Sequence, residues 1–186
     1  VLVASFVASA LKKKYPNAKI AFNTNHPMLL QDNPYIDDFV DNQSISKNLY
    51  QLYFNLDLAY EYRPKTNILT AYAETVGVKP EDCDFYLKTT PINVPDNYIV
   101  IHAGATNWAG RNWASIKFDL ISKKLKEKGH TIVCIGKGSD YFVDCDLDLR
   151  NKTNIFELAY VIKHSKIFVG IDSFPMHIAQ TFNKPG

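Results

Sequence analysis

Segments with the pattern of a buried strand alternate with segments with the pattern of an amphipathic helix, most clearly after residue 97. Strands that alternate with helices form parallel sheets covered by helices on both faces. The predicted fold class is therefore α/β. The strands of this half are predicted over residues 98–102, 130–135, 147–149 and 166–171, and the helices over residues 115–128 and 154–163 and from Phe174 onward.

The predicted helix ends of this half carry residues that favour them. Gly129 follows the helix over residues 115–128 in the position of a C-cap. Asn154 precedes the next helix, and Glu157 three residues later completes the arrangement of a capping box. Ser173 precedes the last helix as its predicted N-cap, with a proline in the first turn.

The first half of the chain shows a weaker form of the same pattern. Residues 89–97 contain two prolines and several other turn formers, which predicts a linker. The chain is therefore divided into an incomplete, small N-terminal domain of residues 1–91 and a truncated C-terminal domain of residues 92–186. Within the first domain, helices are predicted over residues 1–15, 46–53 and 66–76, strands over residues 18–22 and 56–60, and extended chain near residues 85–87.

Composition excludes several classes of protein. The 186 residues are 46% hydrophobic and 22% charged, which is ordinary for a soluble globular chain. A net charge of +2 argues against nucleic acid as the main partner. The three cysteines lack zinc-like spacing and argue against a closed disulfide framework, and no apolar run is long enough to span a bilayer. A cytoplasmic location fits these features.

Two further features bear on the context of the chain. The lysine run at residues 12–14 is either the solvated end of the first helix or a weak attraction to an anionic membrane surface. The chain has no initiator Met and opens inside a helical pattern, and a further strand would be expected after its last residue. It is therefore interpreted as a fragment of a longer protein.

Polar residues follow the strand over residues 166–171, where the last helix begins. In open α/β sheets, ligands bind at the carboxyl ends of the strands. The unpaired N–H groups at the start of a helix favour an anion such as phosphate. Asp172 and Ser173 occupy this junction, and His177 lies about one turn into the helix, so all three are predicted to face one pocket.

A second polar loop follows the strand over residues 98–102. Gly104 lets the backbone turn tightly or approach a ligand closely, and Arg111 has the geometry to clamp phosphate oxygens with two parallel hydrogen bonds. The alternative is a surface loop with Trp113 in the core and Arg111 in solvent. Two such loops in one half of the chain favour a shared anionic ligand.

Three other patterns give weaker support to other chemistries. Residues 136–140 lack the third glycine of the dinucleotide fingerprint. The residue types of a hydrolase triad occur around Ser173, but without the G-x-S-x-G elbow between strand and helix. Asp144 and Asp146 resemble a metal-binding D-x-D motif, although an acidic loop before a short strand is the commoner explanation.

Four segments resemble the heptosyltransferase family, glycosyltransferase family nine, which has GT-B architecture. Residues 1–20 resemble the family's first helix and second strand, and residues 98–113 resemble the start of its C-terminal domain. Residues 148–161 resemble the start of its next helix. The most specific segment is residues 172–179, followed by residues 183–185, which resembles the signature Asp-Ser/Thr-Gly-x-x-His-x-Ala.

The resemblance implies a GT-B-like fold of two Rossmann-like domains, the first on the acceptor side and the second holding the nucleotide sugar. It implies an inverting, metal-independent glycosyltransferase. The enzyme would move a sugar such as heptose from a nucleoside-diphosphate donor to a hydroxyl of a glycan or lipopolysaccharide-type acceptor. No cofactor is expected, and peripheral contact with the inner membrane surface would accompany such an acceptor.

The resemblance also implies roles for single residues. Asp172 contacts the donor sugar, and the backbone N–H groups of Ser173 and Phe174 receive the diphosphate. His177 supports that pocket. Arg111 takes the place of the family's phosphate-binding lysine. Gly104, at the start of the same loop, is also assigned to phosphate binding.

The chain departs from the family pattern in three places. The N-terminal part up to about Pro91 is shorter than the family norm, so the acceptor cleft is expected to be reduced or different. Phe174 stands where the family has glycine, so its side chain is expected to crowd the diphosphate or change the turn. The family's general base lies just before the position of Val1 and is not in this chain. These departures leave open an alternative, a non-catalytic nucleotide-sugar-binding module.

Overall fold

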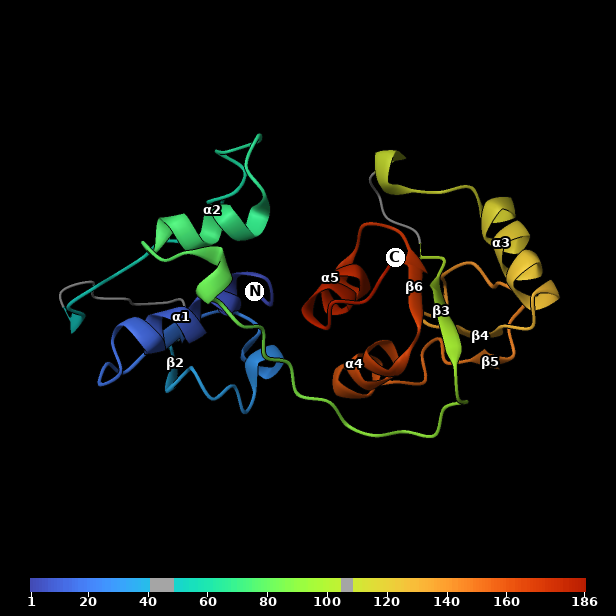
Figure 1. Cartoon of the computed structure of the whole chain (residues 1–186), viewed down its shortest axis with the longest axis horizontal. Helices are drawn as coiled ribbons and strands as arrows, with labels where there is room; N and C mark the ends of the chain where they lie inside the picture. Colours follow the sequence, from blue (N-terminus) through green and yellow to red (C-terminus); the bar gives the residue numbers. More distant parts are fainter. Residues whose placement is uncertain (41–48, 105–108) are drawn as a thin grey trace. The chain divides into compact units, whose positions relative to one another are not determined.

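The computed structural model describes residues 1–40, 49–104 and 109–186 and divides into two compact units (Figure 1). Unit 1 is Val1–Lys88 and unit 2 is Thr89–Gly186. The segment predicted to be a linker is irregular chain at the start of unit 2. The division therefore falls close to the boundary predicted at residue 91.

Unit 2 is built on a four-stranded parallel sheet in the order β5-β4-β3-β6. Figure 1 shows α3 on one face of this sheet and α4 and α5 on the other. The predicted α/β class with parallel strands is confirmed. The elements are β3 (Tyr98–His102), α3 (Ser115–Glu127), β4 (Thr131–Cys134), β5 (Leu147–Asp148), α4 (Ile155–His164), β6 (Ile167–Gly170) and α5 (Phe174–Thr181).

Side chains of β3 alternate between the two faces of the sheet, as the pleat requires. Ile99 and Ile101 lie in one buried cluster with Phe118 of α3. On the other face, the Tyr98 hydroxyl donates a 2.7 Å hydrogen bond to the backbone carbonyl of Val161 in α4. His102 follows Tyr98 by four residues in β3, so its side chain lies on the same face of the sheet, which α4 and α5 cover.

The strand order creates a topological switch point between β3 and β6. The strands β4 and β5 extend the sheet on one side of β3, whereas β6 lies on the other side. His102 at the end of β3 is in register with Gly170 at the end of β6. Ligands of open α/β sheets bind at such a point. The two predicted phosphate-binding loops therefore leave the sheet at the same edge.

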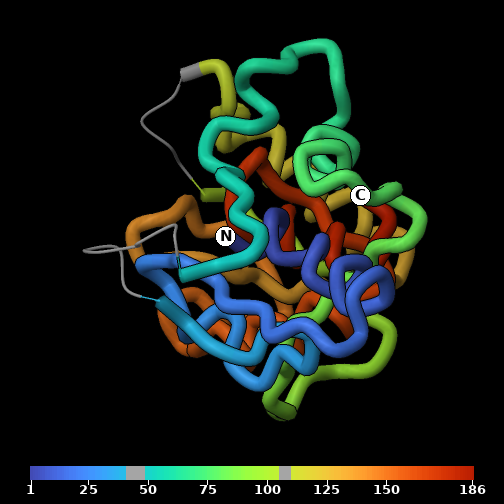
Figure 2. Tube along the Cα trace, turned by 90° about the vertical axis from the view of Figure 1, so that its left-hand side faces the viewer, coloured from blue at the N-terminus to red at the C-terminus, as the bar shows by residue number. Residues whose placement is uncertain are grey.

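Unit 1 contains less regular structure, and its chain path is blue to green in Figure 2. Its core joins the first helical segment to α2 through Phe6, Val7, Tyr72 and Ala73. The predicted first helix is divided into a 3-10 turn and α1. The elements are η1 (Ala4–Phe6), α1 (Val7–Lys14), β1 (Ala21–Asn23), η2 (Pro27–Leu30), β2 (Asp38–Val40), α2 (Ile68–Thr75) and η4 (Pro80–Asp82), with β1 and β2 parallel.

The strand predicted over residues 56–60 is wrong. Residues 57–60 form turns, and Leu58 has a φ of 56°. The side chain of Asn55 accepts a 2.9 Å hydrogen bond from the N–H of Asp57, a local turn that competes with extended chain.

Only part of the helix predicted over residues 46–53 can be compared with the structure. Residues 46–48 lie outside the described residues, and residues 50–53 do not form a helix. The strand predicted over residues 18–22 is displaced toward the C-terminus, to β1, and its partner β2 was not predicted. Three-residue strands carry too few side chains to show a period of two.

The lysine run at the end of α1 ties this helix to the rest of unit 1. The three ammonium groups bind acceptors at 2.6–2.8 Å, so the helix end is not simply solvated. Among the described residues, no helix has both the length and the apolar run that crossing a bilayer requires. The acceptors are the carboxylate of Asp37 for Lys12, the carboxylate of Asp84 for Lys13 and the carbonyl of Gly77 for Lys14.

Two helices begin with asparagine caps. The Oδ1 atom of Asn154 accepts hydrogen bonds from the N–H groups of Phe156 (2.9 Å) and Glu157 (3.0 Å), and the Glu157 carboxylate accepts the Asn154 N–H, so the predicted capping box is confirmed. In unit 1, Asn67 accepts a 2.9 Å hydrogen bond from the N–H of Leu69.

Replacing Asn154 by Ala is expected to lower the free energy of unfolding of unit 2 by about 1 kcal/mol, because the first turn of α4 loses its acceptor. Both tryptophans of the chain, Trp108 and Trp113, belong to unit 2, so tryptophan fluorescence in a urea titration reports this unit. The matched control is Asn154→Asp, which keeps an acceptor. Equal stability of the Ala and Asp variants would contradict the capping role.

Candidate functional site

The two polar loops meet at the carboxyl edge of the sheet in unit 2. Arg111 ends the short 3-10 helix η5 (Ala109–Arg111) after β3, and Asp172 follows β6. The Nε atom of Arg111 lies 3.1 Å from Oδ2 of Asp172, and the two side chains are 43% and 46% exposed. An ion pair this exposed contributes little to stability. A ligand can therefore rearrange it at small cost.

Ser173 occupies the N-cap position of α5, as predicted, but its side chain does not cap the helix. Its backbone is extended, and the hydroxyl makes no hydrogen bond to the first turn. The Oγ atom lies 3.2 Å from Nδ1 of His102 and 3.2 Å from the carbonyl oxygen of Ile171. The hydroxyl is therefore held on the sheet side of the junction.

His102 and Asp140 belong to this site although the sequence did not single them out. The Nε2 atom of His102 lies 3.5 Å from Oδ2 of Asp140, and both side chains are less than a tenth exposed. Burial lowers the pKa of His102 below its ordinary value, and the Asp140 carboxylate opposes this shift only in part. Neutral imidazole is therefore favoured near neutral pH.

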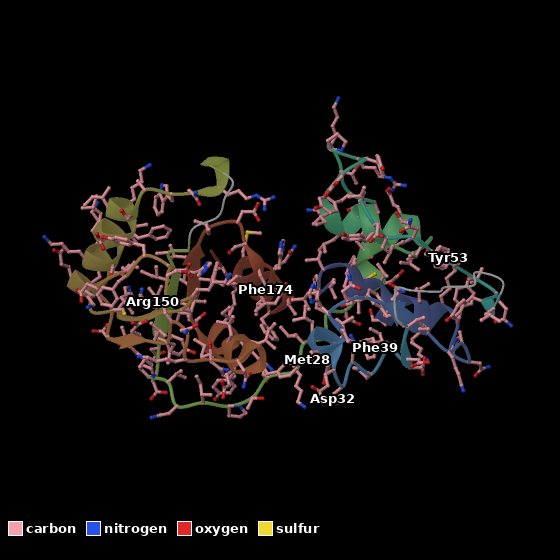
Figure 3. The ribbon with its side chains drawn as sticks, turned by 180° about the vertical axis from the view of Figure 1, so that it is seen from behind. Met28, Asp32, Phe39, Tyr53, Arg150 and Phe174 are labelled. Carbon is pink, nitrogen blue, oxygen red and sulfur yellow. The ribbon has the colours of Figure 1, made fainter. Side chains whose placement is uncertain are left out.

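The loop that carries Asp140 is fastened to the sheet. The Oδ2 atom of Asp140 accepts a 2.6 Å hydrogen bond from the N–H of Lys137. The guanidinium of Arg150, labelled in Figure 3, forms an ion pair with Asp148 and donates from Nη1 to the Asp140 carbonyl at 2.8 Å. The carboxylate beside His102 is thus fixed in place.

Three glycines make room for His102. A Cβ atom at Gly104 would lie 2.6 Å from ring atoms Cε1 and Nε2, and one at Gly136 would lie 3.0 Å from Cδ2. One at Gly170 would lie 3.1 Å from the Cβ of His102. Gly104 therefore serves packing, and its predicted part in ligand binding stays a prediction. A histidine at a strand end with glycines closing neighbouring strands is the sequence signal that could have revealed this site.

His177 lies in the first turn of α5, and its Nδ1 atom is buried without a hydrogen-bond partner in the described chain. Burial lowers the pKa of its imidazole, while the charge of Asp172 raises it and that of Arg111 lowers it. The ring is therefore within electrostatic reach of the ion pair. That Asp172, Ser173 and His177 face one pocket stays a prediction.

Phe174 is the first residue of α5 and is half-buried (Figure 3). It is not among the described residues with positive φ. The start of this helix therefore does not require glycine, and the phenyl side chain is accommodated without backbone strain.

The acidic residues before β5 have structural partners. The Nζ atom of Lys126 lies 3.0 Å from Oδ2 of Asp144 and 3.6 Å from Oδ1 of Asp146. Asp146 also accepts a 2.8 Å hydrogen bond from the N–H of Ile132. Over residues 1–40, 49–104 and 109–186, no three His, Cys, Asp or Glu side chains are grouped to hold a metal ion.

Taken together, the site offers a guanidinium, a helix N-terminus and one exposed carboxylate at the switch point. The first two are donors suited to a phosphate group. The carboxylate is an acceptor suited to hydroxyl groups. Residues 105–108 of the loop before Arg111 lie outside the described chain.

The two buried imidazoles make the stability of unit 2 depend on pH. The pKa values of His102 and His177 are lowered on folding, so the unfolded chain binds more protons, and the stabilisation present above about pH 6.5 is lost as the pH falls. We expect a smaller free energy of unfolding at about pH 5.5 than at about pH 7.5. Urea titrations followed by tryptophan fluorescence measure it. The control is a variant with asparagine at both positions, and an equal pH dependence in that variant would contradict the assignment.

Comparison with known proteins gives a family. The sequence model of glycosyltransferase family 9 (heptosyltransferase) matches residues 39–186. Lipopolysaccharide heptosyltransferase 3 of Escherichia coli (strain K12) is 28% identical over 128 residues, which are 61% of this chain and 37% of that protein. The chain therefore spans little more than a third of the length of this curated relative.

Solved structures show the same fold. The crystal structure of a family 9 glycosyltransferase from Veillonella parvula matches with a TM-score of 0.73 at 14% identity, covering 99% of this chain and 75% of that one. The dodecameric iron-containing heptosyltransferase TibC of enterotoxigenic Escherichia coli, in complex with ADP-D-β-D-heptose, matches with a TM-score of 0.69 at 15% identity. That match covers 100% of this chain and 55% of TibC. The GT-B-like architecture implied by the sequence is confirmed.

Proposed function

Because this chain belongs to glycosyltransferase family 9, we propose that it serves an inverting, metal-independent transfer of a sugar from a nucleoside-diphosphate donor. The acceptor is a hydroxyl of a glycan or of a lipopolysaccharide-type molecule. The observation that carries the proposal is the meeting of Arg111 with the start of α5 at the switch point of unit 2. The ADP-heptose bound by TibC and the name of the Escherichia coli relative support a heptose donor and a lipopolysaccharide acceptor.

The charges of the site match the charges of the reaction. Breaking the bond between sugar and diphosphate leaves negative charge on the phosphates and positive charge on the sugar ring. Donors that are already aimed at the developing negative charge lower the barrier, and one such donor is typically worth ~3–4 kcal/mol. The guanidinium of Arg111 and the N–H groups at Ser173 and Phe174 are the donors in this proposal.

The ion pair between Arg111 and Asp172 gives the site two states. In this structure the two side chains hold each other at 3.1 Å. When the diphosphate binds, the guanidinium turns to the phosphate oxygens, and the Asp172 carboxylate becomes an acceptor for the sugar hydroxyls. Since both side chains are nearly half exposed, this exchange requires little desolvation.

The contacts of the acidic residues before β5 support a transfer reaction that uses no metal ion. Asp144 and Asp146 are bound to Lys126 and to backbone, so they have a structural use. The iron named for TibC is a property of that protein. Unit 1 takes the acceptor side, and both a cytoplasmic location and contact with the inner membrane surface stay predictions. The lysine run offered for such contact is bound within unit 1.

Replacing Arg111 by Ala is expected to weaken the binding of ADP about ten-fold, because the diphosphate loses charge-assisted hydrogen bonds worth roughly 1.5 kcal/mol. Isothermal titration calorimetry measures the Kd. The matched control is Lys123→Ala, which removes one exposed positive charge from α3, away from the site. An unchanged Kd in the Arg111 variant would remove this residue from the donor site.

Replacing Asp172 by Asn is expected to reduce sugar transfer at least about ten-fold and to leave ADP binding equal or tighter. The reason is that the variant loses an acceptor for the sugar and also a negative charge beside Arg111. Transfer is followed with labelled nucleotide sugar in protein that also carries the family's general base, and in the presence of EDTA, because the proposal requires no metal ion. Equal losses of binding and transfer would contradict the role of Asp172.

The control for Asp172 is Asp144→Asn, which changes a carboxylate that is 82% exposed and paired with Lys126. This control is expected to bind and transfer normally. Loss of transfer in this variant, together with sensitivity to EDTA, would favour a metal-dependent reaction instead.

A further inference from the structure

Among the α-helices that the structure describes, the N-cap residue of α5 behaves unlike the other two polar N-caps. Asn67 and Asn154 each turn their side chains onto the first turn of their helices. Ser173 occupies the same position before α5, and serine is among the best capping residues. Its hydroxyl nevertheless makes no cap hydrogen bond and points to His102 and the Ile171 carbonyl. Something in the sheet therefore holds this hydroxyl away from the helix.

His102 is the group in position to do so, because its ring is held on several sides. A Cβ atom at Gly104 would occupy space that the ring fills, and one at Gly136 would occupy space that the Asp140 carboxylate and the edge of the ring share. The Asp140 carboxylate lies 3.5 Å from Nε2 and favours a proton on that nitrogen. The lone pair of Nδ1 then faces Ser173 Oγ at 3.2 Å and shares the single hydroxyl proton with the Ile171 carbonyl, which is also at 3.2 Å. The burial that lowers the pKa of His102 favours this neutral form.

The consequence appears at the N-terminus of α5. Pro175 has no N–H, and the N–H of Met176 bonds to the Ser173 carbonyl at 3.0 Å. A serine hydroxyl free to cap would turn onto the Met176 N–H and place a partly negative oxygen at the helix start. An anion bound by the N–H groups of Ser173 and Phe174 would have to share that space. A serine held toward the sheet leaves the space open.

We propose that His102 is a positioning residue that holds the Ser173 hydroxyl toward the sheet and so keeps the N-terminus of α5 open for the diphosphate of the donor. The inference rests on the proposed function for the identity of the ligand. The hydrogen-bond geometry around His102 carries the positioning role itself.

The test uses His102→Leu, which keeps most of the side-chain volume and removes both ring nitrogens. With one of its two acceptors on the sheet side gone, the Ser173 hydroxyl is expected to turn onto the Met176 N–H and cap α5. Because a serine cap is typically worth ~1 kcal/mol, ADP should bind about five-fold more weakly in calorimetry. The conservative variant His102→Asn places an amide oxygen near the position of Nδ1 and is expected to restore wild-type affinity.

A second-site variant separates positioning from packing. In His102→Leu/Ser173→Ala no hydroxyl is left to cap the helix, so the affinity for ADP should return to that of Ser173→Ala alone. Wild-type affinity in His102→Leu overturns the inference. So does a double variant that binds as weakly as His102→Leu, since the loss then comes from damaged packing.

A crystal structure of His102→Leu without ligand decides the inference apart from the proposed function. If Ser173 Oγ lies within hydrogen-bonding distance of the Met176 nitrogen in that structure, the positioning role of His102 is supported. If Oγ is still bound to the Ile171 carbonyl, the role is overturned. Should the wild-type chain fail to bind ADP, the proposed function falls, and the position of Oγ in this crystal structure still tests the role of His102. Should the Leu variant fail to fold, the same comparison is made with His102→Gln.

Discussion

The pairing of β3 with β4 on one side and β6 on the other is the constraint on which the site in unit 2 depends. Because the strands are parallel, their carboxyl ends share one edge of the sheet. Because the order reverses at β3, the loops after β3 and β6 lead to helices on opposite faces of the sheet, and ligands of open α/β sheets bind where this happens. The register that sets His102 beside Gly170 fixes how close these loops come. The contact between Arg111 and Asp172 is a consequence of that register.

Backbone space is the second element of the site. A buried imidazole at a strand end needs room that side chains on adjacent strands would occupy, and Gly104, Gly136 and Gly170 provide it. Glycine weakens strands and loops because the unfolded chain has more freedom to lose. Unit 2 therefore gives up some stability to enclose His102. This is the pattern expected where a fold keeps a polar group at a site of function.

The features that could be predicted from the sequence are those that interactions between residues close in sequence determine. Asn154 with Glu157 and Gly129 after α3 act on their own helices, and both ends lie where expected. The strand over residues 56–60 failed because an asparagine side chain formed a local turn that hydrophobic alternation does not reveal. The convergence of Arg111 with Asp172 followed from the rule for parallel strands. The contact of Ser173 with His102 joins residues far apart in sequence through a register that no local pattern encodes, so Ser173 was expected to cap α5.

Ser173, His102 and Asp140 are also the residue types of a hydrolytic triad, and their surroundings decide between the two chemistries. A general base must take a proton readily, whereas burial lowers the pKa of His102 and makes its imidazole a weaker base. The glycine-lined space fixes the ring, and the partly buried Ser173 hydroxyl is turned toward the Ile171 carbonyl. The exposed groups at this edge are Arg111 and Asp172, which suit a phosphate and a sugar. His102, Asp140 and Ser173 therefore shape the site, and the exposed pair faces the ligand in the proposed function.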